Sequence, residues 1–122
     1  MFVRAELRSL FSSDVDDLRS YSSAESFRVT VRAMIGPKGE PGEESFDFDV
    51  CSPAWLADEL GRRPLIAGRC RLFMAQFSYE AVEGYVLQQI AGATGDDWGE
   101  VAAKLSRWAY WEFEDYVVSP GC

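Results

Sequence analysis

The sequence predicts an α+β fold in which a mainly antiparallel sheet has helices packed on one face. Strand-like alternation of apolar and polar residues dominates the first half of the chain, and a glycine- and proline-rich turn joins two of these runs. Helix-like periodicity dominates the last third. Strands that cluster ahead of helices are typical of the α+β class. We expect residues 1–122 to form a single domain.

The first strand is predicted at 2–11, where apolar residues recur at every second position and Phe11 closes the apolar face. A polar loop follows over 12–26, with one helical turn near 14–18. The same alternation of side chains recurs in three later stretches of the sequence. The remaining strands are therefore expected at 27–35, 45–51 and 69–77.

The turn GPKGEPG between the second and third strands indicates an antiparallel hairpin, because no regular element accommodates its glycines and prolines. Side chains alternate along a strand, so Phe46 and Phe48 should point into the core and Asp47 and Asp49 outward. The other residues expected in the core are Val29, Val31, Leu72, Val86, Ile90 and Leu105.

Three helices are predicted from their capping signals, with N-caps at Ser52, Ser78 and Asp97. Pro53 follows the first cap at the position where helices favour proline, and Glu100 completes a capping box with the third. The helices are expected over 53–60, from 79 to about 91, and from 98 onward. The stretch 107–118, RWAYWEFEDYVV, fits a helix and a strand equally.

The chain is strongly acidic, with 20 acidic against 12 basic residues and a formal net charge of -8 at pH 7. This field repels phosphate backbones and anionic lipid, so we expect no direct nucleic-acid partner and no membrane association. It speeds encounter with a basic partner, although solubility alone would also explain it. The absence of a signal-peptide pattern and of a disulfide framework favours a cytoplasmic protein.

The chain contains no histidine, which removes the commonest general base and metal ligand together with the Ser-His and Cys-His dyads. We therefore predict a protein that is not an enzyme and requires no cofactor or metal. A carboxylate-only hydrolase or a cation site stays open as an alternative. The acids available to either are the pair Asp47 and Asp49 and the loop cluster Asp14, Asp16 and Asp17. A solvated strand face and a polar loop are the preferred interpretation of these two groups.

Aromatic residues alternate with acids near the C-terminus. Aromatic side chains anchor interfaces and acids complement a basic partner, whereas core packing competes as the explanation for each tryptophan. We predict a partner-binding surface that combines the acids of the hairpin and the tail with one tryptophan. Its residues are Glu43, Glu44, Asp47, Asp49, Trp111, Glu112, Glu114 and Asp115.

Three parts of the sequence resemble immunity protein 8 of bacterial polymorphic toxin systems. They are RAELRSL, AMIGPKGEPGEESFDFDVCSPAWL, and Asp97-Trp98 with LSRWAYWEFEDY, whereas residues 61–94 carry little of the resemblance. The resemblance implies a cytoplasmic protein that binds and blocks a cognate toxin domain, and it assigns no inhibitory residues. A nuclease with a basic cleft would suit an acidic inhibitor, but a peptidase, a deaminase or a pore-forming domain fits the sequence equally. The alternative is an acidic adaptor or oligomeric interaction protein without a toxin partner.

Overall fold

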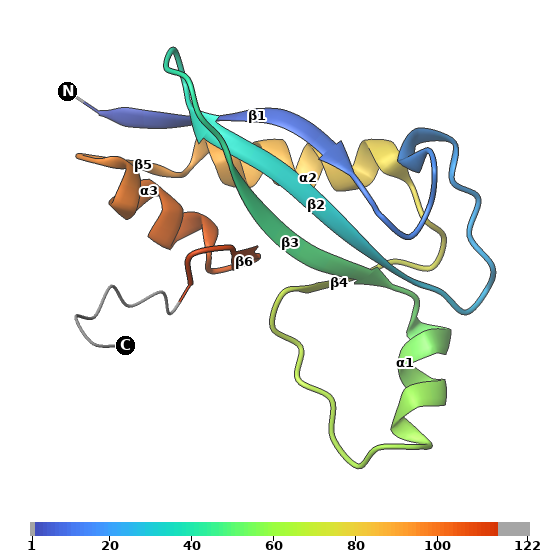
Figure 1. Ribbon diagram of the computed structural model, residues 1–122. Helices are drawn as coiled ribbons and strands as arrows, with labels where there is room; N and C mark the ends of the chain where they lie inside the picture. The colour runs from blue at the N-terminus through green and yellow to red at the C-terminus, as the bar shows by residue number, and fades with distance from the viewer. Residues whose placement is uncertain (1, 115–122) are drawn as a thin grey trace, which may run out of the picture.

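A computed structural model describes residues 2–114 of the chain and shows an α+β fold (Figure 1). The strands are β1 (Val3–Phe11), β2 (Arg28–Pro37), β3 (Glu44–Cys51), β4 (Arg71–Phe73), β5 (Thr94–Gly95) and β6 (Tyr110–Trp111). The helices are α1 (Pro53–Leu60), α2 (Tyr79–Ala91) and α3 (Trp98–Leu105), with one 3₁₀ turn, η1 (Leu18–Ser20). The predicted helical turn near 14–18 therefore lies slightly later in the chain.

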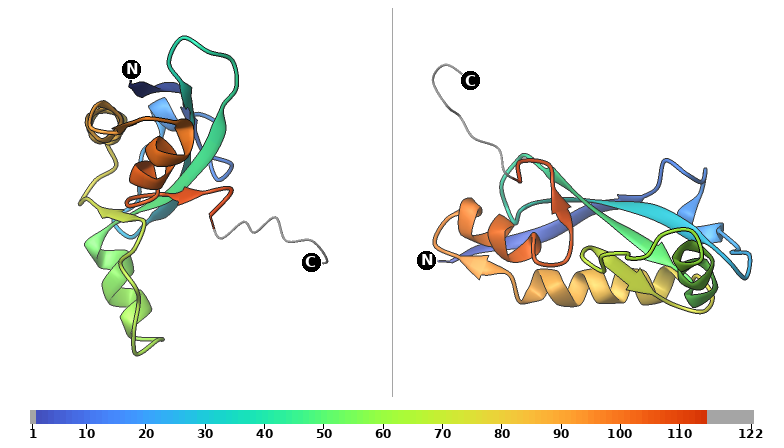
Figure 2. Two further views of the ribbon diagram at one scale, coloured as in Figure 1. Left: turned by 90° about the vertical axis from the view of Figure 1, so that its left-hand side faces the viewer. Right: turned by 90° about the horizontal axis from the view of Figure 1, so that it is seen from below.

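The strands form one mixed sheet in the order β4-β3-β2-β1-β5, and β6 pairs with β3. The hairpin of β2 and β3 is antiparallel, as predicted. In contrast, β4 runs parallel to β3, and the strands curl into a half-barrel (Figure 2). The prediction of a mainly antiparallel sheet is corrected, because the chain crosses over through α1 and a long loop before it returns to β3.

The three helices do not share one face of this sheet. Helix α2 runs behind β1 and β2 and buries Val82, Val86 and Ile90. Helix α3 lies near β5 and buries its apolar residues in the same core (Figures 1 and 2). Helix α1 contains no buried residue and projects from the end of the sheet. The expectation of helices packed on one face is wrong for α1, because it lies beyond the end of the sheet, where Trp55 contacts partly exposed arginine side chains of β2 and β4.

The helix starts follow the local chemistry of their caps. The side chains of Ser52, Ser78 and Asp97 each accept a hydrogen bond from the backbone N–H three residues later, as predicted. Glu100 also accepts a hydrogen bond, but from the N–H of Asp96 at 2.8 Å and not from that of Asp97. These caps fix where α2 and α3 begin, and therefore how they meet the sheet.

A β-bulge in β1 changes which of its side chains face the core. The pairing with β2 shifts between Leu7 and Ser9, so that Leu10 lies opposite the core residue Ala33. Phe11 consequently lies opposite Arg32 and is 43% exposed, although strict alternation assigned it to the apolar face. One extra residue in a strand inverts the alternation beyond it.

The core lies between the hairpin and helices α2 and α3. Of the residues expected there, Val29, Val31, Phe46, Phe48, Val86, Ile90 and Leu105 are buried. Leu72 is only half-buried, because the strand predicted at 69–77 shortens to the three residues of β4 at the sheet edge. The ambiguous stretch 107–118 forms the short strand β6 as far as the structure describes it.

Candidate partner-binding surface

The hairpin turns its polar side chains away from the helices. On β2 these are Arg28, Thr30 and Arg32, and on β3 they are Asp47 and Asp49. The strand register places Arg32 opposite Asp47 and Thr30 opposite Asp49. Acids and bases of neighbouring strands therefore alternate across this outer face of the hairpin, as cross-strand pairing favours.

Asp47 forms a two-pronged ion pair with Arg32. The Nε and Nη2 atoms of Arg32 donate to the two carboxylate oxygens of Asp47, each at 2.9 Å. The hydrogen bond and the charge of Asp47 are the main causes that raise the pKa of Arg32, and the charge of Glu112 adds to them. Two parallel hydrogen bonds fix the direction of both side chains, so this carboxylate is held in place and partly compensated.

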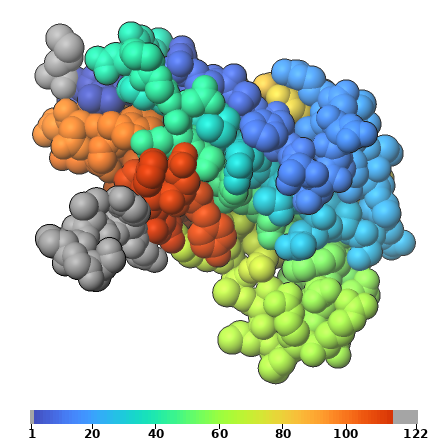
Figure 3. Space-filling model, viewed as in Figure 1, coloured from blue at the N-terminus to red at the C-terminus, as the bar shows by residue number. Residues whose placement is uncertain are grey.

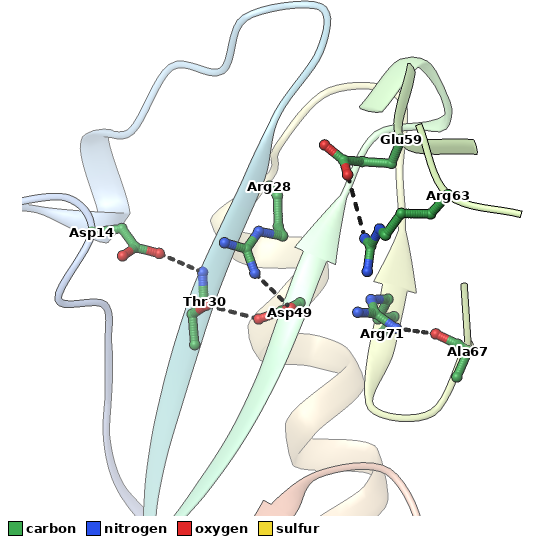
Figure 4. A network of polar contacts seen from close by, with 8 residues as sticks. All are labelled: Asp14, Arg28, Thr30, Asp49, Glu59, Arg63, Ala67 and Arg71. Carbon is green, nitrogen blue, oxygen red and sulfur yellow. Dashed lines mark hydrogen bonds and ion pairs between the residues drawn. The ribbon is translucent and has the colours of Figure 1, made fainter. Parts of the chain in front are cut away.

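Asp49 and Asp14 both accept hydrogen bonds from Thr30, in the neighbouring part of β2 (Figure 4). The hydroxyl of Thr30 donates to Asp49 at 2.8 Å, and Arg28 lies 3.4 Å from the same carboxylate. The backbone N–H of Thr30 donates to Asp14 at 2.8 Å, so the loop after β1 is bound to the strand. Asp17, from the same loop, caps η1. Asp14 and Asp17 of the loop cluster, like Asp47 and Asp49 of the hairpin, therefore have structural partners.

Strand β6 brings the C-terminal acids to this outer face. It pairs Trp111 with Phe46 and Tyr110 with Asp47. Glu112 then lies next to Ser45, whose backbone N–H donates to the Glu112 carboxylate at 2.6 Å. Figure 3 shows this last segment, in red, lying against the hairpin on the face turned to the viewer. Ser45 and Glu112 are 67 residues apart in the chain, so two distant acidic stretches form one surface.

Glu44 has an inward role. It lies two residues before Phe46, on the core side of β3, although the strand predicted from the sequence begins only at residue 45. Its Oε1 atom accepts a hydrogen bond from the indole N–H of Trp98 at 2.7 Å and from that of Trp111 at 2.8 Å. The ring of Trp111 also stacks on Phe46, with 6.4 Å between ring centroids. One carboxylate therefore joins the hairpin, α3 and β6, and it satisfies two partly buried donors.

Glu114 ends the described part of the chain in a second two-pronged ion pair. The Arg69 guanidinium donates to both carboxylate oxygens, one of them at 2.7 Å, and lies 4.8 Å from the ring of Tyr110. This hydrogen bonding lowers the pKa of Glu114 from its ordinary value of 4.5. The pair binds the C-terminal segment to the loop that precedes β4.

Comparison with known families gives a match that covers most of the chain. The family model of immunity protein 8 matches residues 5–116, which is nearly the whole chain. The chain belongs to the immunity protein 8 family. No curated protein and no solved structure gives a significant match. Immunity proteins counteract toxins and as a class are generally non-catalytic, so family membership indicates a protein partner.

The structure distributes the predicted contact residues of this immunity protein over two roles. Asp47, Asp49 and Glu112 share the outer face, and Glu43 is exposed in the turn beside them without a polar partner among residues 2–114. The residues with inward or anchoring roles are Glu44, Trp111 and Glu114. Asp115 lies outside the described residues. Sequence reasoning missed the arginines that pair with these acids, although their alternate positions on β2 were a usable signal.

The chemistry available to this immunity protein is limited in the part of the chain that the structure describes. No group of three or more histidine, cysteine or acidic residues there is placed to hold a metal ion. Asp47 lines a small hollow with Phe11 and Thr30, but that hollow contains a single carboxylate, whereas hydrolysis by acids requires two. Within residues 2–114, no helix has the length and apolar character needed to cross a membrane.

The two cysteines within residues 2–114 offer no activated nucleophile. Cys51 and Cys70 are both buried and unpaired. Burial, followed by the charge of Asp49, raises the pKa of the Cys51 thiol to about 11. Burial also raises the pKa of Cys70. Both thiols therefore stay protonated at neutral pH, and the thiolate is the form that reacts.

Proposed function

We propose that this chain binds a cognate bacterial toxin domain in the cytoplasm and neutralises it by blocking its working surface, without catalysis. The observation that carries the proposal is the family match over residues 5–116. A bound inhibitor requires only a complementary surface, and the molecule exposes 7587 Å². A standard interface takes roughly 800 Å² from each partner, so one face of this chain suffices.

We further propose that the contact surface is the one predicted from the sequence, with Glu43, Asp47, Asp49 and Glu112 facing the toxin. Glu44, Trp111 and Glu114 support it by holding β6 beside the hairpin. Asp115 continues the same acidic sequence beyond the described residues. Because Asp47 is already oriented by Arg32, its carboxylate loses little freedom when it meets a basic group of the partner.

A toxin with a basic cleft fits this surface best. Nucleases use such clefts to bind phosphate groups, and carboxylates on an inhibitor occupy the same positions with the same sign of charge. Opposite net charges also raise the association rate, which matters when the toxin must be blocked as soon as it appears. We therefore propose a nuclease domain as the toxin.

The test is expression, in a bacterial host with and without this chain, of a toxin domain encoded next to the gene for this chain. Growth should be lost with the toxin alone and restored by co-expression, and the two proteins should elute as one complex from a sizing column. A control co-expresses the immunity protein of an unrelated toxin. Lack of protection together with lack of a complex would remove the proposal.

A further inference from the structure

The part of the chain between β3 and α2 differs in charge from the rest of the molecule. No acidic residue occurs from Leu60 to Tyr79, and this stretch contains four of the twelve basic residues. They are Arg62, Arg63, Arg69 and Arg71. We define the arginine arm as residues 53–71, which include α1, the loop after it and the first residue of β4. A basic arm on a chain of net charge -8 requires a specific explanation.

The arginine arm contributes little to the core. Helix α1 buries no residue, and of the residues from 60 to 69 only Ile66 is partly buried, whereas the others are exposed. Leu60 is 46% exposed and Leu65 is 80% exposed. Figures 1 and 3 show the arm projecting from one end of the molecule, in green, clear of the sheet. Exposed leucines on a projecting element are available to a partner, because binding would remove their apolar surface from water.

Guanidinium groups gather at the base of the arm. Arg28 and Arg71 lie 5.9 and 6.0 Å from the ring of Trp55, so the half-buried indole orients both. Arg71 donates to the carbonyl of Ala67, and its buried Nε has no hydrogen-bond partner among residues 2–114. In Figure 4 the side chain of Arg63 extends from the arm toward the side of β4 on which Arg71 lies.

The arginines of the arm outnumber the carboxylates that they contact. Arg62 and Arg63 share the single carboxylate of Glu59, at 2.8 and 3.4 Å. Arg71 contacts no carboxylate in the described part of the chain. Arginine is the residue best suited to bind carboxylates from a partner, because its planar donors match both oxygens. The arm therefore offers free donors next to exposed apolar side chains.

We propose that the arginine arm is a second docking element, which receives an acidic, partly apolar segment of the toxin domain. This inference rests on the proposed function and adds a partner chemistry opposite to that of the acidic surface. Carboxylates of the segment bind Arg62, Arg63 and Arg71, and its apolar side chains cover Leu60 and Leu65. Two contacts of opposite sign fix the orientation of the toxin, because reversal of the complex would place like charges together.

The experiment measures the affinity and rates of toxin binding for the full chain and two variants that both remove two positive charges. The arm variant is R62Q/R63Q/L65S, at three exposed positions. The matched control is R4Q/R107Q, at two exposed arginines outside the arm. Melting temperatures of both variants verify that the fold is retained. All affected side chains are on the surface, so both variants should melt close to the wild-type protein.

We expect the arm variant to bind the toxin at least about tenfold more weakly, mainly through faster dissociation, as the loss of interface anchors does. The control should bind as well as the wild-type protein or slightly faster, because both variants make the chain more acidic. If the arm variant behaves like the control while the wild-type protein binds tightly, the arm proposal is wrong and the proposed function stands. Absence of binding by the wild-type protein would overturn both.

Discussion

At the scale of single residues, two carboxylates hold the C-terminal segment in place. Glu44 accepts hydrogen bonds from the indoles of Trp98 and Trp111, and Glu114 binds the guanidinium of Arg69. Both acids were predicted as contact residues because of their charge. The predicted strand began one residue after Glu44, so its inward position was missed, and charge alone does not show that Arg69 lies beside Glu114. The indole N–H groups were a partial signal, since a buried tryptophan usually requires an acceptor.

Replacing Glu44 by alanine leaves two partly buried indole donors without an acceptor. We expect E44A to lower the free energy of unfolding by about 1–3 kcal/mol, as other unsatisfied buried donors do. E44Q keeps one acceptor oxygen and should lower the free energy of unfolding by less than E44A does. The matched control is E43A, because the exposed Glu43 has no polar partner in the described chain, and it should change stability by less than about 0.5 kcal/mol. Urea denaturation measures all three, and equal effects of E44A and E43A would contradict the role of Glu44.

The ion pair of Glu114 and Arg69 predicts a dependence of stability on pH. Hydrogen bonding to Arg69 lowers the pKa of Glu114 in the folded state below its ordinary value of 4.5. The stabilisation is therefore fully present above pH 4.5 and is lost as the pH falls through the lowered folded pKa. The difference in stability between the wild-type protein and E114Q should be larger at pH 7 than in strong acid. A constant difference across this range would exclude the linkage.

At the scale of elements, local chemistry was predictable and tertiary pairing was not. The caps at Ser52, Ser78 and Asp97 and the hairpin of β2 and β3 follow from residues close in the chain, and all four were predicted. The bulge in β1 and the parallel pairing of β4 were not predicted, and the stretch that contains β6 was left open between helix and strand. Each of these depends on a partner more than 20 residues away, which periodicity does not detect.

The hairpin requires glycine at position 36, which gives a prediction with an internal control. A Cβ atom added to Gly36 would lie 2.1 Å from the carbonyl oxygen of Gly42, so the closed end of the hairpin would have to open. We expect G36A to lower the free energy of unfolding by about 1–3 kcal/mol. Gly84 of α2 has no atom within 4 Å of such a Cβ, and G84A should stabilise the helix by about 0.5–1 kcal/mol. Thermal unfolding measures both variants. Melting temperatures that shift in the same direction from that of the wild-type protein would contradict this prediction.

At the scale of the whole molecule, net charge indicated a basic partner but not how the charges are arranged. The acids of the outer face are paired with arginines: Asp47 with Arg32 and Asp49 with Arg28. The free acidic charge therefore concentrates at the turn and at Glu112, while the opposite end of the molecule carries the arginine arm. Composition does not predict this separation, because it results from how the strands pair.

The central claim is that the acidic outer face, and not the net charge alone, steers the chain to a basic toxin. The variant E43K/R32E/D47R tests it, because it exchanges the charges of the cross-strand ion pair without breaking it and reverses one exposed acid. The control R32E/D47R keeps the net charge of -8. Both variants should retain the fold, because the core face of the hairpin is unchanged.

The decisive measurement is the association rate with the toxin domain at low and at physiological ionic strength. For the wild-type protein the rate should fall as salt is added, because screening weakens attraction between opposite charges. At low ionic strength E43K/R32E/D47R should associate at least about tenfold more slowly and respond less to salt. The association rate of R32E/D47R should lie between those of the wild-type protein and E43K/R32E/D47R. Equal rates and equal salt dependence for all three proteins would show that the acidic face serves solubility alone and that the toxin binds elsewhere.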